Sequence, residues 1–234
     1  MSDIRDNLLT IGTKIKQYST LYQRPKNSTQ LLAVSKRHTT ESITTAYNVG
    51  QRAFGENYAQ ELFDKNEKLT KLDIEWHFIG PLQSNKAKKI AQVADWVHAV
   101  DRLKIAKKLS ENRPENLPPL SICLQINISG EDSKSGVEPD DLFTLAEAVT
   151  QLPHLKLRGL MVIPAPEDDF TKQRSVFAKV ATLKTALENH LIQQGIDVTL
   201  DTLSMGMSND IEAAIAEGAT IVRVGTAIFG QRDS

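Results

Sequence analysis

The chain has 234 residues, with 28 Lys and Arg, 29 Asp and Glu, and a formal net charge of −1 at pH 7. This length suits one large domain, so we expect residues 1–234 to form a single domain. The near-zero net charge argues against a nucleic-acid partner and against binding to an acidic membrane surface. No run of 18 apolar residues and no basic and apolar leader is present, which predicts a soluble, cytoplasmic protein. The single cysteine, Cys123, lies in an apolar run and is predicted to be a buried thiol in a reducing compartment.

Short apolar or β-branched runs alternate with longer segments of helical spacing along the chain. This alternation is typical of a parallel sheet covered by helices. Eight runs are predicted as strands, over residues 31–35, 52–55, 75–80, 96–100, 121–128, 156–163, 202–205 and 221–225. The helices between them are predicted to start near Thr40, Asn57, Ser84, Asp101, Pro139, Asp169 and Ser208. One extra helix is expected before the first strand.

The number and order of these elements favour an α/β fold in which the sheet closes into a (β/α)8 barrel of the TIM type. No Gly/Ser-rich linker and no break in composition divides the chain, which argues against an open doubly wound sheet with separate halves. In such a barrel the functional groups lie where the strands end and the following loops begin. The predicted strand ends are richer in polar residues and glycine than the strands, so we expect the functional site at that face.

Lys36 directly follows the apolar run of residues 32–34 and Ser35, at the predicted open end of the barrel. Burial there would lower the pKa of its amine, and the neutral amine is the nucleophile that condenses with an aldehyde to an imine. The alternative is a lysine that extends to the surface and has no chemical role. Its position alone does not decide between the two.

Two turns near the C-terminus suit a phosphate group. The segment 204–208 places serines and glycine between a strand and a helix, and Gly225 and Thr226 follow the last strand. Hydroxyl groups and free backbone N–H groups bind phosphate oxygens, and the last loops of a barrel commonly do so. The alternative for the first turn is that Ser208 or Asn209 only caps the next helix.

Arg223 interrupts the apolar last strand and would be buried if it points inward. A buried guanidinium needs a partner, and a salt bridge to Asp201 or Glu56 is one interpretation. The other is a hydrogen bond from Arg223 to a heteroaromatic nitrogen, which would then stay unprotonated because arginine keeps its proton.

Taken together, several segments resemble the pyridoxal phosphate homeostasis protein family, and the resemblance spans essentially the whole chain. These segments are 32–36, 54–58, 76–86, 133–136, 158–161, 204–208 and 222–230. The resemblance implies a single barrel similar to the N-terminal domain of bacterial alanine racemase, a protein of PLP fold type III. It also implies that the cofactor pyridoxal 5′-phosphate (PLP) is held as a Schiff base on Lys36.

The same resemblance implies further binding residues. It places Arg223 opposite the pyridine nitrogen and gives Lys134 a role in cofactor exchange, for which a solvated loop charge is the alternative. It implies no catalytic residue and no metal site. The implied PLP contacts, besides Lys36, are Asn57, His77, Ser204, Gly206, Met207, Ser208, Arg223, Gly225 and Thr226.

The function that the resemblance implies is that of a carrier, not an enzyme. Such a protein holds PLP exchangeably and indirectly balances amino-acid and keto-acid pools, with apo forms of PLP-dependent enzymes as partners and a monomer as the simplest assembly. One alternative is a racemase or lyase of low activity that uses Tyr58 or His77 as a proton carrier. An alanine-type racemase has a second, β-rich domain, whereas this chain is expected to end at its barrel. A second alternative is a phosphosugar-binding enzyme that forms a transient imine on Lys36.

Overall fold

Eight parallel strands form a closed barrel in the order β1 to β8, each strand paired with the next and β8 paired with β1. The structure, a computed structural model, describes residues 3–128 and 135–231. The predicted (β/α)8 barrel is therefore confirmed. The strands are β1 Gln30–Val34, β2 Ala53–Glu56, β3 Glu75–Phe78, β4 Trp96–Val100, β5 Leu120–Gln125, β6 Leu155–Met161, β7 Thr202–Ser204 and β8 Ile221–Val224.

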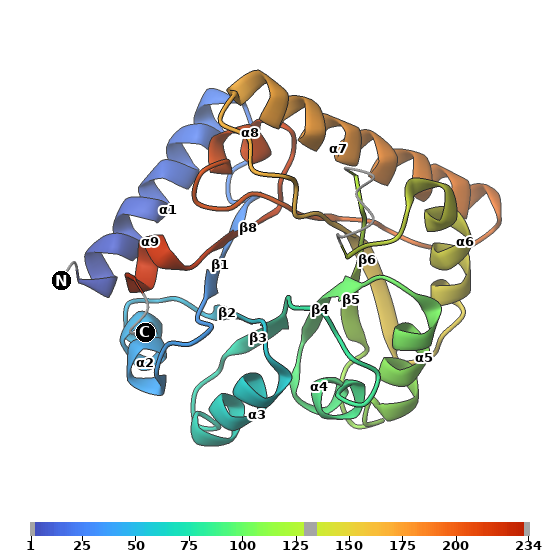
Figure 1. The fold of residues 1–234 in the computed structure, drawn as a ribbon, viewed down its shortest axis with the longest axis horizontal. Helices are drawn as coiled ribbons and strands as arrows, with labels where there is room; N and C mark the ends of the chain where they lie inside the picture. The colour runs from blue at the N-terminus through green and yellow to red at the C-terminus, as the bar shows by residue number, and fades with distance from the viewer. Residues whose placement is uncertain (1–2, 129–134, 232–234) are drawn as a thin grey trace.

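Helices surround the strands on the outside of the barrel (Figure 1). The expected helix before the first strand is present as α1, which packs against α2, α8 and α9. The short α9 follows β8 and was not predicted, because four residues are too few for a helical period to be recognised. The helices are α1 Ile4–Leu21, α2 Thr40–Asn48, α3 Ala59–Lys68, α4 Ala87–Val93, α5 Leu103–Asn112, α6 Pro139–Thr150, α7 Phe170–Gln193, α8 Ile211–Ala216 and α9 Thr226–Phe229.

The predicted strand over residues 121–128 was too long at its C-terminal end. β5 ends at Gln125, and the chain then forms an isolated bridge between Ile126 and Val137. The Val137 N–H donates to the Gln125 carbonyl oxygen at 2.8 Å, and the Asn127 N–H donates to the Val137 carbonyl oxygen at 3.0 Å. The Ile126 N–H still donates to the Met161 carbonyl oxygen of β6 at 3.0 Å, and from Asn127 onward the pairing is with Val137.

The core has two layers. Apolar residues between the strands and the helices form one large cluster that includes Phe54, Phe78 and Phe177. Inside the barrel lie two smaller clusters, one around Leu32 and one that contains Cys123. Cys123 is a buried free thiol, as predicted, and burial raises its pKa to about 12. Its thiol is therefore a packing group.

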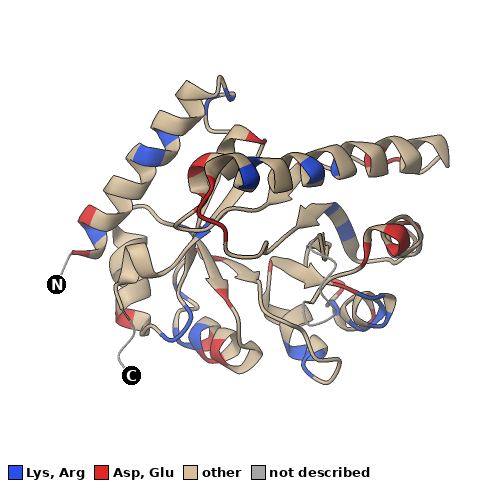
Figure 2. Ribbon diagram, turned by 45° about the horizontal axis from the view of Figure 1, so that its top comes forward, with Lys and Arg blue, Asp and Glu red and all other residues tan. Residues whose placement is uncertain are grey.

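The outer helices carry both positive and negative side chains (Figure 2), in keeping with the net charge of −1. Among the helices of residues 3–128 and 135–231, none combines the length and the apolar character needed to cross a membrane. Within the same ranges no group of three or more His, Cys, Asp and Glu side chains is arranged to hold a metal ion.

Candidate functional site

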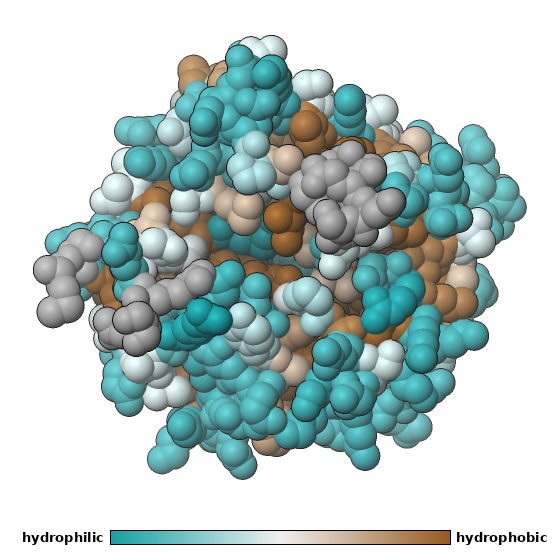
Figure 3. All heavy atoms as spheres, in the orientation of Figure 1, coloured by the Kyte–Doolittle hydropathy of each residue, from teal (hydrophilic) through white to brown (hydrophobic). Residues whose placement is uncertain are grey.

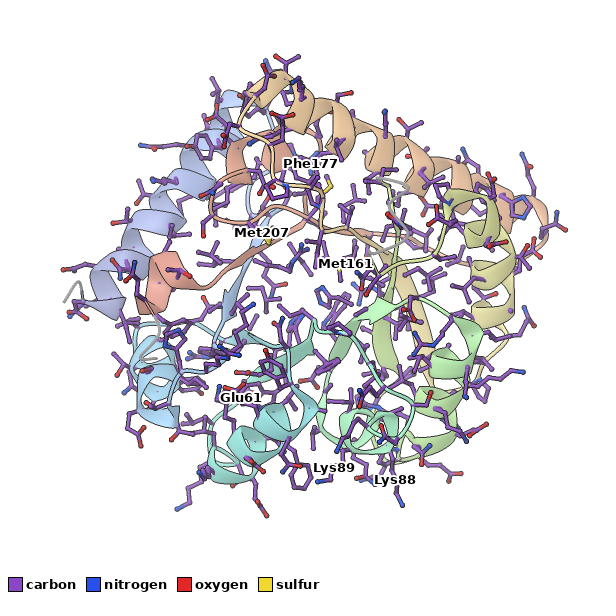
Figure 4. All side chains as sticks on the ribbon, in the orientation of Figure 1. Glu61, Lys88, Lys89, Met161, Phe177 and Met207 are labelled. Carbon is purple, nitrogen blue, oxygen red and sulfur yellow. The ribbon has the colours of Figure 1, made fainter. Side chains whose placement is uncertain are left out.

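A pocket of about 200 Å³ lies at the C-terminal ends of β1, β2, β7 and β8, where the barrel was predicted to carry its functional groups. Figure 3 shows a hollow near the middle of the visible face, and in Figure 4 the labelled Met207 lies over the ring of strands. Seven of the ten predicted cofactor-binding residues line this pocket. Its lining consists of Val34, Lys36, His38, Asn57, Ile79, Ile163, Met207, Ser208, Arg223, Gly225 and Thr226.

Lys36 follows β1, and its half-buried side chain lines the pocket. Side chains of α3 hold the peptide groups on both sides of it. Lys65 Nζ donates to the Ser35 carbonyl oxygen at 2.7 Å, and the Arg37 N–H donates to Glu61 Oε1 at 2.5 Å. Arg37 has a φ of 62°, a left-handed conformation that costs free energy in a residue with a side chain. The outer helix therefore fixes the backbone turn from which Lys36 leaves the strand.

The carboxyl group of Glu56, at the end of β2, binds side chains that hold the same turn. Its Oε1 accepts hydrogen bonds from Ser35 Oγ at 2.6 Å and from Lys65 Nζ at 2.7 Å. The side chain is completely buried, and burial raises the pKa of Glu56 to about 7 although Lys65 lowers it. Glu56 is thus a structural partner of the Lys36 turn.

Asn57 follows β2, lines the pocket and carries a buried acceptor without a partner among the described residues, the side-chain oxygen Oδ1. A buried polar atom without a partner costs free energy, so a site of this kind is stabilised by a ligand that supplies a donor. A polar aromatic ligand that brings a hydrogen-bond donor to this atom would fit the pocket.

The turn after β7 places Met207 and Ser208 at the pocket. Helix α8 begins only at Ile211, with Asp210 in the N-cap position, and Asp210 Oδ1 accepts the Met207 N–H at 2.5 Å. The interpretation of Ser208 or Asn209 as the helix cap is therefore wrong, and α8 starts three residues after the predicted start near Ser208. The Ser208 side chain lines the pocket instead.

Two glycines let the backbone of this region pack closely. Gly206 has a φ of 95°, and a Cβ atom there would lie 2.6 Å from the Cβ of Ala214. A Cβ atom at Gly225 would lie 3.0 Å from the Val34 carbonyl oxygen, so this glycine lets the end of β8 approach β1. Thr226 follows with an exposed side chain that lines the pocket together with Met207 and Ser208.

Arg223 points into the barrel and is only 4% exposed. Its Nη1 donates to Ser204 Oγ and its Nη2 donates to the Val162 carbonyl oxygen, both at 2.8 Å. Burial lowers the pKa of Arg223 to about 10, so the guanidinium remains protonated at neutral pH. The predicted salt bridges are absent among the described residues, because Asp201 pairs with Arg158 and Glu56 with Lys65.

Three predicted residues do not line the pocket. His77 and Ser204 are buried inside the barrel and belong to a hydrogen-bonded chain that ends at Arg223. Gly206 is buried below the first phosphate-type turn and shapes it. Lys134, for which a role in exchange was predicted, lies outside the described residues.

Two histidines at the pocket and beneath it were not predicted from the sequence. His38 follows Lys36 by two positions and stacks on Phe229, with ring centroids 5.0 Å apart. His98, which contacts His77 and Ser204 beneath the pocket, was also missed. The signal for His98 was present, because it interrupts an apolar strand just as Arg223 does.

The comparisons with known proteins agree with this geometry. A family model described as "Alanine racemase, N-terminal domain" matches residues 11–233. The alanine racemase of Clostridium difficile, at 15% identity, has a TM-score of 0.74, covering 99% of this chain and 57% of its own. The fold and the pocket thus define a barrel of the alanine racemase N-terminal type.

Relatives of higher identity narrow the assignment. Curated proteins of Pseudomonas aeruginosa and Vibrio cholerae, both named pyridoxal phosphate homeostasis protein, are 51% identical and cover 100% of this chain and 97% and 98% of their own. The structure of PipY from Synechococcus elongatus, solved with PLP bound, is 38% identical, has a TM-score of 0.84, and covers 97% of this chain and 100% of its own. The chain therefore belongs to the pyridoxal phosphate homeostasis protein family.

Proposed function

We propose that the chain binds PLP in the pocket at the C-terminal ends of the strands and holds it as a Schiff base on Lys36. The Schiff base forms when the amine nitrogen of Lys36 attacks the aldehyde carbon of PLP and water leaves. The observation that carries the proposal is the convergence on one pocket of a lysine amine, a buried arginine and hydroxyl groups from two turns. The bound PLP in the related PipY structure supports it.

The lining residues fit the polar groups of PLP. Ser208 and Thr226 offer hydroxyl groups from two neighbouring loops to the phosphate. Arg223 offers a guanidinium to the pyridine nitrogen, which keeps that nitrogen unprotonated and makes the ring a weaker electron sink. The unpaired Asn57 Oδ1 is suited to accept a hydrogen bond from a polar group of the ring.

We further propose that the protein is a carrier for PLP homeostasis and not an enzyme. The curated relatives are named homeostasis proteins, which supports a role in holding and exchanging the cofactor. Met207, Ser208 and Thr226 are exposed at the pocket, so a ligand there can exchange with solvent. This proposal includes a cytoplasmic location, a monomeric state, delivery of PLP to apo enzymes and an indirect effect on amino-acid and keto-acid pools.

The geometry gives the racemase or lyase alternative little support. Tyr58 does not line the pocket, and its hydroxyl lies 3.4 Å from Arg37 Nη2. His77 is buried below the pocket, and both of its ring nitrogens have partners. Neither suggested proton carrier therefore faces the pocket. Loss of the α-proton of amino acids in deuterated water, well above the rate with free PLP, would favour the enzyme.

The decisive experiment is an absorption spectrum and an intact mass of the purified protein after borohydride reduction. We expect a PLP adduct in the wild type and in Lys88→Ala, whose lysine lies on α4 outside the barrel (Figure 4). We expect no adduct in Lys36→Ala. A wild type without adduct or chromophore would refute PLP binding and leave the phosphosugar alternative. An adduct retained in Lys36→Ala would refute the assignment of the lysine.

A further inference from the structure

A continuous chain of hydrogen bonds crosses the interior of the barrel beneath the pocket. Glu75 Oε1 lies 2.5 Å from His77 Nε2, and His77 Nδ1 lies 2.8 Å from His98 Nε2. His98 Nδ1 lies 2.8 Å from Ser204 Oγ, which lies 2.8 Å from Arg223 Nη1. The side chains come from β3, β4, β7 and β8, so the chain links opposite walls of the barrel.

The same chain joins the two ends of the barrel. Glu75 is the first residue of β3, has a side chain that is 39% exposed, and lines a second cavity of about 360 Å³ at the N-terminal ends of the strands. His77, His98 and Ser204 are completely buried. Arg223 lines the pocket at the other end. A buried polar path therefore runs from solvent at one face to the candidate cofactor site at the other.

The two ends of the chain fix the direction of their own hydrogen bonds. A guanidinium can only donate, so Ser204 Oγ accepts from Arg223. The hydrogen bond from His77 lowers the pKa of Glu75, whose carboxylate therefore stays ionised and can only accept. His77 must then donate to Glu75 from Nε2.

The middle of the chain follows from the protonation of His98. Burial holds the pKa of His98 well below its ordinary value, so this ring is neutral and has a single N–H. Of the arrangements with a single proton on His77, only the one in which both histidines are protonated on Nε2 pairs a donor with an acceptor at every contact. Ser204 then donates to His98, His98 donates to His77, and His77 donates to Glu75.

We infer that Ser204 and His98 are positioning residues that fix the plane of the Arg223 guanidinium, and through it the hydrogen bond that the guanidinium offers in the pocket. This inference rests on the proposed binding of PLP. Ser204 Oγ lies 2.8 Å from both His98 Nδ1 and Arg223 Nη1, so the contact with His98 fixes the hydroxyl group that accepts from Arg223. Together with the Val162 carbonyl oxygen, Ser204 holds two guanidinium nitrogens at 2.8 Å.

A role in folding alone does not account for this polar chain. Buried polar groups are costly unless all are paired, and an apolar interior avoids that cost. Next to the polar chain, the cluster of Ala99, Cys123 and Met161 shows that apolar residues can fill the interior of this barrel. The polar side chains instead form a line that ends at Arg223, the member that faces the pocket.

The variants His98→Asn and His98→Gln separate the two halves of the chain. The asparagine amide lies near the place of Nδ1 and keeps a partner for Ser204, whereas the glutamine amide reaches toward the place of Nε2 and His77. We expect His98→Gln and Ser204→Ala to release PLP about 10-fold faster and to shift its absorption maximum. We expect His98→Asn to stay close to the wild type. Cys123→Ala is the control, with a lower Tm and an unchanged spectrum.

Nitrogen-15 NMR of the histidine side chains tests the same inference without any variant and without PLP. We expect His98 as a neutral ring protonated on Nε2 at pH 7. A His98 ring that is charged, or that carries its proton on Nδ1, would overturn the assigned direction and with it the positioning role.

The possible failures are distinguishable. If the wild type traps PLP but Ser204→Ala and His98→Gln match Cys123→Ala in release rate and absorption maximum, the positioning role is wrong and the proposed function stands. If His98→Asn behaves like His98→Gln, contact with Ser204 is not what matters and the inference is also wrong. If the wild type traps no PLP, the proposed function falls, and the inference falls with it.

Discussion

The buried carboxyl group of Glu56 should make the stability of this protein fall as the pH rises toward neutrality. Burial raises the pKa of Glu56 from 4.5 to about 7. Between these two pH values the folded chain holds a proton that the unfolded chain has released, so protonation favours the folded state. The contribution of Glu56 to the free energy of unfolding is fully present below pH 4.5 and falls as the pH rises to about 7. Above that pH it no longer changes.

The magnitude follows from the width of this window. The interval from 4.5 to about 7 covers about 2.5 pH units, and each corresponds to about 1.36 kcal/mol, which gives a loss of about 3 kcal/mol. Glu56→Gln keeps an oxygen that can accept from Ser35 Oγ and Lys65 Nζ but has no proton to release. The free energy of unfolding of this variant should therefore lack this decline.

Urea unfolding of the wild type and of Glu56→Gln at several pH values between 4.5 and 8 measures the difference. The exposed Glu115 provides a matched control, because Glu115→Gln should decline with pH in parallel with the wild type. A difference between wild type and Glu56→Gln that stays constant, or that grows in favour of the wild type as pH rises, would refute the reasoning. It would mean that the ion pair with Lys65 outweighs the burial of Glu56.

Three further predictions concern the pocket. Gly206→Ala should destabilise the fold by about 2–4 kcal/mol, because the residue has a φ of 95° and its new Cβ would overlap with the core. Gly195→Ala is the control: its φ is 77° and no neighbour lies within 4 Å, so it should cost only about 1 kcal/mol in the same urea titration. Ser208→Ala or Thr226→Ala should speed PLP release more than it lowers the Tm of the apo protein, since a charge-assisted phosphate bond contributes about 1.5–3 kcal/mol; equal damage to both would make these residues structural. Arg223→Gln should shift the absorption maximum of bound PLP while borohydride still traps the adduct, and an unchanged maximum would place Arg223 away from the ring.

The barrel was predictable because its repeating unit is local. Each apolar run followed by a helical segment is visible within about thirty residues, and eight such units suggest closure. The ends of elements were less predictable, because they depend on partners far along the chain. Residues 126–128 have the composition of a strand, yet the barrel pairing ends at Ile126 because Val137 offers a local bridge.

The candidate site was predictable where a residue is unusual for its element. Lys36 and Arg223 were conspicuous as charges beside apolar strands, and both line the pocket. The role of His77 depended on geometry that the sequence does not contain. Its ring lies inside the barrel below the pocket and contacts His98, which comes from the next strand. The link from His98 to Ser204 joins residues 106 positions apart, and no spacing rule predicts it.

Separate sets of hydrogen bonds hold the backbone turn at Lys36 and the side chain of Arg223. The turn that carries Lys36 is fixed from outside the barrel, where Lys65 and its partners on α3 bind the flanking peptide groups. The guanidinium of Arg223 is fixed from inside the barrel by Ser204. The hydrogen bonds named for one support include no residue named for the other, so we expect a change in one to act mainly on the side chain that it holds. In the PLP complex that we propose, the contact of Arg223 with the pyridine nitrogen can therefore vary without a shift of the Lys36 amine, and the reverse also holds.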